Sequence, residues 1–167
     1  MAALTGTYTL IASQTLASAA SSVTFSDIPQ TYTDLIIPVV IGNSANGTRD
    51  LQWKFNGDSG SNYSGTALEG NDSAASSGRD TSFTYLRANG SANNTPSTST
   101  IIHLIDYSNS TTYKTMLSRS NSTTWVMMAK AHLWRSTAAI TSIVFTCESS
   151  NFVAGSTFKL YGIEAAK

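Results

Sequence analysis

Residues 57–60 read Gly-Asp-Ser-Gly, the string in this chain that comes nearest to a catalytic motif. In one class of serine proteases this string surrounds the nucleophile, and its glycines allow backbone amides to stabilise an oxyanion. Those enzymes carry their histidine before the serine, whereas His103 and His132 both follow Ser59. The polar setting NGDSGSNY favours a turn after a strand that ends at Phe55. We predict such a turn. A hydrolase that uses Ser59 as its nucleophile is the third functional hypothesis, after the two that are given at the end of this section.

Oxygen ligands that could bind calcium follow the same turn, but the pattern is incomplete. Asp58, Asn62 and Glu69 occupy positions one, five and twelve of an EF-hand-like loop. Gly60 offers no side-chain oxygen at position three, and Tyr63 replaces the glycine that position six requires. We therefore predict no metal site and no cofactor.

Two histidines and one cysteine are the other reactive side chains. His103 and His132 alternate with apolar neighbours in separate strand-like segments, and no cysteine or carboxylate has the spacing of a metal ligand set with them. Cys147 cannot form an internal disulfide because it is the only cysteine, and it shares an apolar face with Ile143 and Phe145. We predict hydrogen-bonded strand histidines, a buried thiol and no catalytic residue.

Aromatic side chains support a rival hypothesis, because flat rings near Asn and Asp side chains can bind sugar rings without any catalytic group. Trp53 lies on the apolar face of its segment, and Trp125 and Trp134 fall on opposite faces of theirs, which favours core packing. Tyr63 and Tyr85 are the surface candidates for glycan or partner binding.

The composition describes a polar but nearly uncharged protein of 167 residues. Charged residues are 12% of the chain, about half the usual share, whereas 26 Ser and 23 Thr supply most of the polarity. Such a surface suits a protein that works in an assembly, because copies repel one another little. Ten basic and ten acidic residues cancel, and no basic run is present, which argues against nucleic acid and membrane surfaces as partners.

The N-terminal sequence MAALTGTYTLIASQ lacks the basic start and long apolar stretch of a signal peptide. No later segment reaches the roughly 18 apolar residues of a membrane span. We therefore expect the protein to be made and folded in the cytosol.

Strand-like segments recur about every ten to fifteen residues with turn-forming residues between them, a spacing typical of sandwiches and barrels. No helical period of useful length appears. We predict an all-β chain, a single-domain antiparallel β-sandwich of about 8–10 strands, with residues 1–6 as an N-terminal arm and residues 7–167 as the sandwich domain. The expected strands are 8–13, 22–25, 34–41, 50–55, 82–87, 100–107, 113–120, 125–133, 140–147 and 157–163.

Two of these segments differ in how many of their faces are apolar. Leu51, Trp53 and Phe55 alternate with polar residues, so that strand should have one face in water. Segment 34–41 is apolar on both faces apart from Pro38. Because proline lacks a donor for the ladder, we expect this strand to bulge at Pro38 or to border another subunit, away from the centre of a sheet.

The end of the chain carries the clearest strand signal. Phe158 and Leu160 face opposite to Lys159 and Tyr161, the period of two that a half-buried sheet requires. A chain that ends by completing a strand has its C-terminus inside the fold, and segment 157–163 predicts this here.

Two stretches, 56–79 and 88–99, are rich in Gly, Ser, Asn and Ala and contain few large apolar residues. We expect both to be long polar surface loops. Loops longer than about twelve residues in a compact domain are usually functional or disordered, so a partner would contact the chain there.

Four stretches carry a likeness that spans nearly the whole chain: TYTLIASQTL at 7–16 with FSDIPQTYTDL at 25–35, FNGDSGSNYS at 55–64, WRSTAAITSI at 134–143, and GSTFKLYGI at 155–163. In these stretches the chain resembles small virion surface proteins of tailed bacteriophages, which commonly close on a similar G-S-x-F-x-L-Y-G-I string. That group includes capsid decoration or cement proteins and modules of tail fibres. The resemblance implies a jelly-roll-like sandwich.

The resemblance also implies a non-enzymatic virion structural protein, and a free-standing domain that attaches itself to a particle fits a decoration protein better than a fibre module. Such a protein would bind the outside of the phage head as a homotrimer and clamp neighbouring major capsid protein subunits. It would lie on the capsid surface after synthesis in the bacterial cytoplasm. The alternative is a tail-fibre or receptor- or glycan-binding module of the tail. The expected contact residues, besides Tyr63 and Tyr85, are Met1, Ala2, Ala3, Leu4, Thr5 and Gly6.

Overall fold

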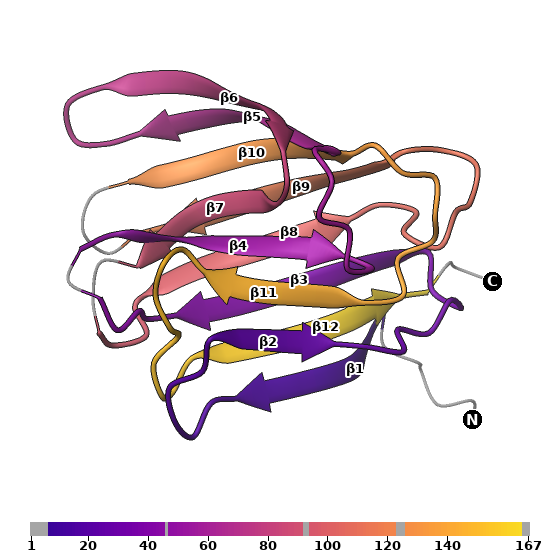
Figure 1. Cartoon of the computed structure of the whole chain (residues 1–167), viewed down its shortest axis with the longest axis horizontal. Coiled ribbons are helices and arrows are strands. Elements are labelled where there is room, and N and C mark those ends of the chain that lie inside the picture. The colour runs from indigo at the N-terminus through magenta and orange to yellow at the C-terminus, as the bar shows by residue number, and fades with distance from the viewer. Residues whose placement is uncertain (1–6, 46, 92–93, 123–125, 165–167) are drawn as a thin grey trace.

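Twelve strands form the described part of the chain, which in this computed structural model comprises residues 7–45, 47–91, 94–122 and 126–164 (Figure 1). The predicted arm at residues 1–6 and the prediction for Trp125 lie outside the described residues. The strands are β1 (Tyr8–Thr15), β2 (Ser22–Phe25), β3 (Asp34–Ile41), β4 (Arg49–Phe55), β5 (Tyr63–Gly70), β6 (Ala75–Phe83), β7 (Leu86–Ser91), β8 (Thr98–Leu104), β9 (Lys114–Asn121), β10 (Met127–Trp134), β11 (Ile143–Cys147) and β12 (Thr157–Ile163).

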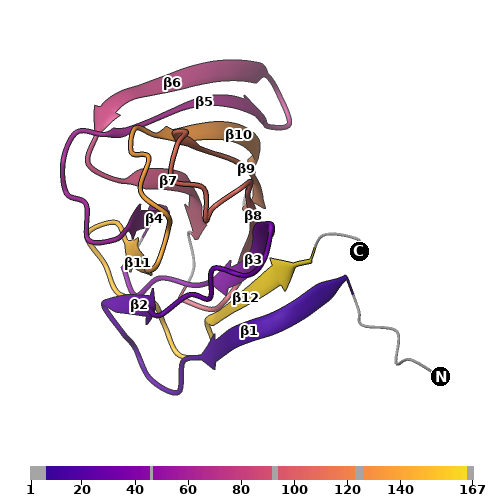
Figure 2. The same cartoon turned by 90° about the vertical axis from the view of Figure 1, so that its right-hand side faces the viewer.

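The strands form two antiparallel sheets that face each other (Figures 1 and 2). The large sheet has the order β1-β12-β3-β8-β9-β10-β5-β6, and the small sheet has the order β2-β11-β4-β7. From β2 to β8 the chain switches sheet at each step except within the β5–β6 hairpin, so strands distant in sequence become neighbours. This alternation is typical of a jelly roll. The predicted all-β, jelly-roll-like sandwich is therefore confirmed.

The core lies between the two sheets, and alternate residues of each facing strand point into it. Leu51, Trp53 and Phe55 of β4 are buried, as the alternation predicted. On the large sheet, Phe158 of β12 contacts the ring of Phe145 at a centroid distance of 5.5 Å and the ring of Phe152 at 5.0 Å. An aromatic cluster therefore joins the last strand to β11 and to the loop before β12.

Strand β3 lies inside the large sheet, between β12 and β8, so the prediction that Pro38 excludes it from a sheet centre is wrong. Pro38 is opposite Ile101 of β8. Toward β12 the register is the same on both sides of the proline, with Val39 opposite Phe158 and Ile36 opposite Tyr161. Pro38 therefore lacks one donor without any shift in register. Only one face of β3 is buried, while Ile36, Pro38 and Val40 lie half-buried on the solvent side of the sheet.

The final strand lies inside the fold, as predicted. β12 is bordered by β1 on one side and by β3 on the other. Tyr8 is opposite Ile163, and Thr15 is opposite Thr157, with one irregularity between Leu10 and Ala12. The first and last described strands therefore stabilise each other.

The stretch 56–79 is mostly a hairpin, so the prediction of a long loop there is wrong. Strands β5 and β6 are joined by a tight turn in which Oδ1 of Asn71 accepts hydrogen bonds from the backbone N–H of Ser73 at 3.0 Å and of Ala74 at 2.7 Å. Side chains of this type replace backbone partners in turns. Strand β6 carries only small or polar residues before Phe83 and is exposed along most of its length, so it has no apolar period to predict.

The second expected loop, 88–99, also contains parts of strands. Its start belongs to β7 and its last two residues belong to β8. The expected strand 82–87 spans the end of β6 and the start of β7, and β5 lies in the first expected loop. The described residues therefore form twelve strands where ten were predicted.

Candidate functional site

The solvent side of the large sheet, called here the outer face, carries exposed apolar side chains on four different strands. They are Tyr8 and Leu10 on β1, Leu68 on β5, Leu117 on β9 and Met127 on β10. Leu117, Leu68 and Met127 are 54%, 67% and 71% exposed, values unusual for such residues at the middle or end of regular strands. The outer face is therefore the best candidate for a contact surface.

Strand register places these side chains on one side of the sheet. Leu117 is opposite His103 of β8 and Ala131 of β10, and Leu10 is opposite Tyr161 of β12. Residues directly opposite each other in an antiparallel pair point to the same face. The apolar side chains thus extend from β1 across the sheet to β5.

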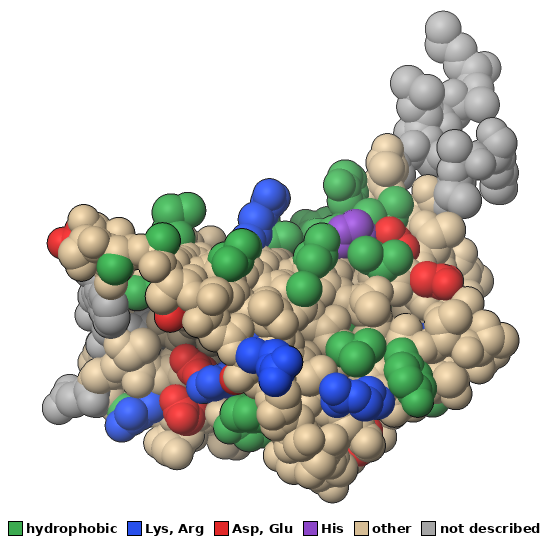
Figure 3. Space-filling model, turned by 90° about the horizontal axis from the view of Figure 1, so that it is seen from above, with side chains coloured by type: hydrophobic (Ala, Val, Ile, Leu, Met, Phe, Trp, Pro, Cys, Tyr) green, Lys and Arg blue, Asp and Glu red, His purple; other side chains and the backbone are tan. Residues whose placement is uncertain are grey.

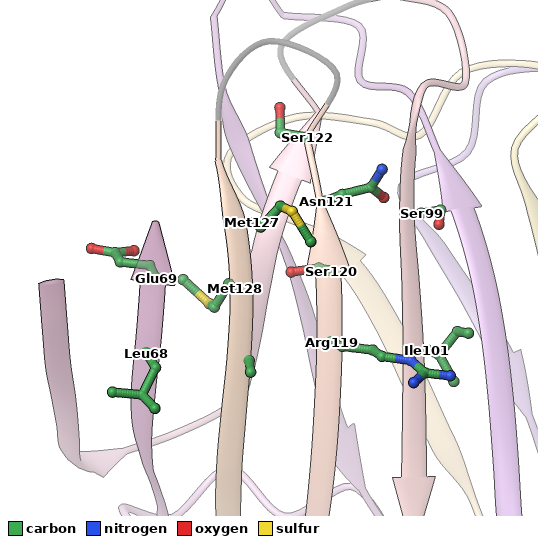
Figure 4. Close-up of a pocket in the computed structure, with 11 residues that line it drawn as sticks. Leu68, Glu69, Ser99, Ile101, Arg119, Ser120, Asn121, Ser122, Met127 and Met128 are labelled. Carbon is green, nitrogen blue, oxygen red and sulfur yellow. The ribbon is translucent and has the colours of Figure 1, made fainter. Parts of the chain in front are cut away.

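A groove of about 570 Å³ hollows one end of this face (Figure 4). Apolar lining comes from Leu68, Met127 and Ile101. Arg119 of β9 extends along the surface toward Ile101 of β8, and the amide of Asn121 adds a polar group (Figure 4). The groove combines a mostly apolar surface with a few hydrogen-bonding groups, the composition of a protein contact site.

The outer face carries few charged side chains, and one of them, Asp34 of β3, is paired with His103 of β8. Nε2 of His103 lies 2.9 Å from a carboxylate oxygen of Asp34. The predicted hydrogen-bonded strand histidine is thus confirmed for His103. Seen from above, hydrophobic side chains protrude along one side of the molecule with a histidine among them, while acidic and basic side chains lie close together elsewhere in the same view (Figure 3).

The sequence at 57–60 forms a turn after β4, as predicted. Asp58 organises it: its carboxylate accepts hydrogen bonds from the backbone N–H of Gly60 at 2.8 Å and from Nε1 of Trp134 at 2.7 Å. Burial raises the pKa of Asp58, but hydrogen bonds from Trp134, Asn62 and Gly60 outweigh that effect and lower it overall. The motif that resembled a nucleophile site therefore ties the β4–β5 connection to the end of β10.

A serine hydroxyl does lie beside an imidazole, but in the interior. Oγ of Ser118 is 2.7 Å from Nε2 of His132, and both residues are buried. Nδ1 of His132 is buried without a hydrogen-bond partner among the described residues, and the ring packs edge-on against Trp53. Burial, and secondly the charge of Lys130, lower the pKa of His132 to about 3 against the opposing effect of Asp80. An imidazole this weakly basic is a poor general base near neutral pH.

His132 should make the protein less stable in mild acid. Its folded pKa of about 3 lies below the usual 6.5, so below pH 6.5 the unfolded chain takes up a proton that the folded chain does not. We expect the free energy of unfolding to fall by up to about 1.4 kcal/mol per pH unit, about 3 kcal/mol by pH 4. Urea titrations between pH 7 and about pH 4.5, where most carboxylates remain ionised, measure this slope. His132→Gln should flatten it and His103→Gln should not; equal slopes in all three proteins would refute the assignment.

The two tyrosines expected on the surface have different environments. Tyr63 is wholly buried, with its ring stacked on Trp134 at a centroid distance of 6.2 Å, so its prediction as a surface residue is wrong. Its hydroxyl donates to the backbone oxygen of Asp58 and accepts from the N–H of Phe55, and burial raises its pKa to about 12. Tyr85 is half-buried and packs edge-on against Phe83.

A charged cluster that was not predicted joins the β5–β6 hairpin to the small sheet. Arg87 of β7 donates to Asp80 of β6 through Nε at 3.1 Å and Nη2 at 2.7 Å, and to Asp50 of β4 through Nη1 at 3.2 Å. Lys130 of β10, itself buried, pairs with the same Asp80. These residues are spread over 80 positions of sequence, between Asp50 and Lys130, and none stands in a motif, so no local signal indicated the cluster.

The remaining predictions on reactive residues concern the core. The Cys147 thiol is free and buried, as predicted, and burial raises its pKa to about 11. Trp53 and Trp134 are buried, as predicted. Within the described ranges, no group of three or more His, Cys, Asp or Glu residues is arranged to hold a metal ion. The described residues also contain no helix with the length and apolar character to cross a membrane.

The fold defines the class of molecule as a jelly-roll-like β-sandwich, and its large sheet exposes apolar side chains on the solvent side. Comparison of the chain with models of known protein families gives no match, and comparison with curated proteins gives none either.

Proposed function

We propose that this chain is a non-enzymatic structural protein of a bacteriophage virion, a decoration or cement protein that binds the outside of the head. In this role it acts as a homotrimer, contacts the major capsid protein and stabilises the contacts between capsid subunits. The observation that carries the proposal is the outer face, where Leu68, Leu117 and Met127 stay exposed on regular strands. The likeness to virion surface proteins in four stretches of sequence adds support.

The chemistry of the outer face favours a protein partner. The chain has no net charge, so it does not attract the phosphates of nucleic acid or anionic lipid. The groove brings Leu68, Ile101 and Met127 together, and an apolar hollow of this kind on a sheet suits a site that another protein covers. A capsid shell presents many identical copies of such a partner surface.

Stabilisation of the shell follows from mass action. A ligand that binds only the assembled shell stabilises it by RT ln(1 + [L]/Kd), about 4 kcal/mol per site at a thousandfold excess over Kd. Summed over many sites, this contribution opposes the outward pressure of packaged DNA. No chemical step is required for that function.

Leu117→Glu on the outer face should weaken binding to heads. Burying a leucine contributes about 1.5–3 kcal/mol, so loss of this contact and burial of a carboxylate should lower affinity at least about tenfold. The measurement is the number of copies retained per head after labelled chain is added to heads assembled without it. Thr24→Glu is the matched control, because it adds the same charge on exposed strand β2 of the small sheet; it should bind like the unaltered chain.

Two results would count against the proposal. Equal binding of the two variants would remove the outer face from the interaction. A few labelled copies at the tail, with none over the head, would support the tail-module alternative. The contribution of residues 1–6 stays a prediction, checked by deleting them and counting copies per head in the same assay.

A further inference from the structure

A second concave region lies beneath the β5–β6 hairpin. The hairpin lies beyond β7, the end strand of the small sheet (Figure 2). Residues of the hairpin and of β7 line a cavity of about 340 Å³. Its lining comes from β4 and β7 on one side and from β5, β6 and β10 on the other. On the large sheet the lining of this hairpin cavity comes mainly from the inner side, through Ala67, Asp80 and Lys130, and the cavity borders the groove of the outer face, with which it shares Glu69 and Met128.

The hairpin cavity concentrates charge in a chain that has little. Six of the ten acidic and ten basic residues of the chain line it: Asp50, Glu69, Asp80, Arg79, Arg87 and Lys130. Three are acidic and three are basic, so the lining has no net charge. Such a site gives no electrostatic preference to an anion or a cation.

Ion pairs hold several of these groups in fixed positions. The Arg87 guanidinium is bound on two sides by Asp80 and Asp50, and its face lies over the ring of Phe83 at 5.2 Å from the centroid. Lys130 is fixed by Asp80. The planar donors and acceptors around the cavity are therefore preorganised, which reduces the entropy lost when a ligand binds.

Hydrogen-bonding capacity remains in the lining. Nδ2 of Asn89 is buried and has no hydrogen-bond partner among the described residues. On the same side, burial raises the pKa of Asp50 although the charge of Arg87 opposes that effect, so its carboxylate is only partly compensated. Hydroxyl groups suit this lining, because a hydroxyl can accept a hydrogen bond from the Asn89 amide or donate one to the Asp50 carboxylate.

We propose that the hairpin cavity binds an uncharged polyhydroxylated ligand, a neutral saccharide residue. The lining has no net charge, the Arg87 guanidinium and its carboxylate partners are fixed in position, and the Asn89 amide has an unused donor. These properties suit hydroxyl groups better than phosphate or ammonium. Ala67, Ala88 and Met128 supply apolar surface for the C–H face of a sugar ring. The volume falls in the range of small-ligand sites. The proposal is tested separately from capsid binding, because its key residue Asn89 lies outside the groove of the outer face.

Saturation-transfer NMR of the full chain with glucose, galactose, mannose and N-acetylglucosamine tests the proposal, with inorganic sulfate as the charged probe. We expect at least one sugar to bind and sulfate not to bind. Asn89→Leu should weaken the binding sugar about tenfold, the loss expected for one buried hydrogen bond. Arg79→Ala, an exposed position in the lining, should also weaken it, whereas Arg119→Ala on the outer face should not.

Thermal unfolding of each variant shows whether it is folded, and Arg79→Ala keeps the test valid if Asn89→Leu does not fold. The proposal is overturned if no neutral sugar binds, if sulfate binds in place of sugars, or if a sugar binds equally to Arg79→Ala and Arg119→Ala. Head occupancy of Asn89→Leu should equal that of the unaltered chain, so failure here leaves the capsid assay unaffected.

Discussion

Phe158→Ala should lose a large part of the stability of the sandwich. The side chain is fully buried between Phe145 and Phe152, on a strand whose two neighbours are β1 and β3. Truncating a buried phenylalanine to alanine costs about 3–5 kcal/mol, a large part of the about 5–15 kcal/mol that holds a typical domain folded. The free energy of unfolding from urea titration at neutral pH measures the loss.

Lys159→Ala is the matched control for that experiment. Lys159 is the next residue along β12 and is exposed, so its truncation should change stability by no more than about 0.5 kcal/mol. Similar losses for both variants would show that the strand tolerates no substitution. A small loss for Phe158→Ala would mean that the aromatic cluster does not fix β12 to the core.

Asp80→Asn should destabilise the protein to a similar degree by a different mechanism. The substitution leaves Lys130, which is buried, without its carboxylate and removes the bidentate partner of Arg87. Breaking a buried pair by removing one partner costs about 3–5 kcal/mol, because an uncompensated charge stays in the interior. Chemical denaturation at pH 7 measures the effect. Asp72→Asn, in the exposed turn between β5 and β6, should be near neutral.

The pH dependence gives a second check on Asp80. Burial raises the pKa of this carboxyl, but hydrogen bonds and charges from Arg87 and Lys130 lower it overall to about 2. Because the folded pKa lies below the unfolded value near 3.9, the carboxylate stabilises the fold above that value, and the contribution is lost as pH falls toward 2. The stability gap between the native chain and Asp80→Asn should therefore narrow by about 2 kcal/mol between pH 5 and pH 2. A gap that stays constant would show that Asp80 is not ionised in the fold.

Strands with one or two apolar faces could be predicted from the sequence, and those without an apolar face could not. Segments 22–25, 34–41 and 157–163 match β2, β3 and β12 because a buried face imposes its period on the residues. β6 has no such period, since it lies at the edge of the large sheet and most of its residues are in water. Its pairing depends on the turn at Asn71 and on the ladder with β5, and neither leaves a hydrophobic pattern.

The contact residues were harder to predict than the fold. Tyr63 looks like a surface residue in a Gly- and Ser-rich stretch, yet the stretch is a strand and its alternation turns the ring inward. Leu117 was placed in a predicted strand, but which face it occupies depends on register with β8 and β10. In β9 the inward residues are Lys114, Met116, Ser118 and Ser120, so polarity along the strand does not distinguish inside from outside.

The position of β12 between β1 and β3 has a consequence for biosynthesis. While the ribosome is still translating the chain, β1 lacks its partner and one edge of β3 is open, because both pair with residues near the other end of the sequence. Unpaired strand edges invite association between nascent chains on neighbouring ribosomes. The large sheet can be completed only after residue 163 has emerged from the exit tunnel, so until then β1 and one edge of β3 stay unpaired.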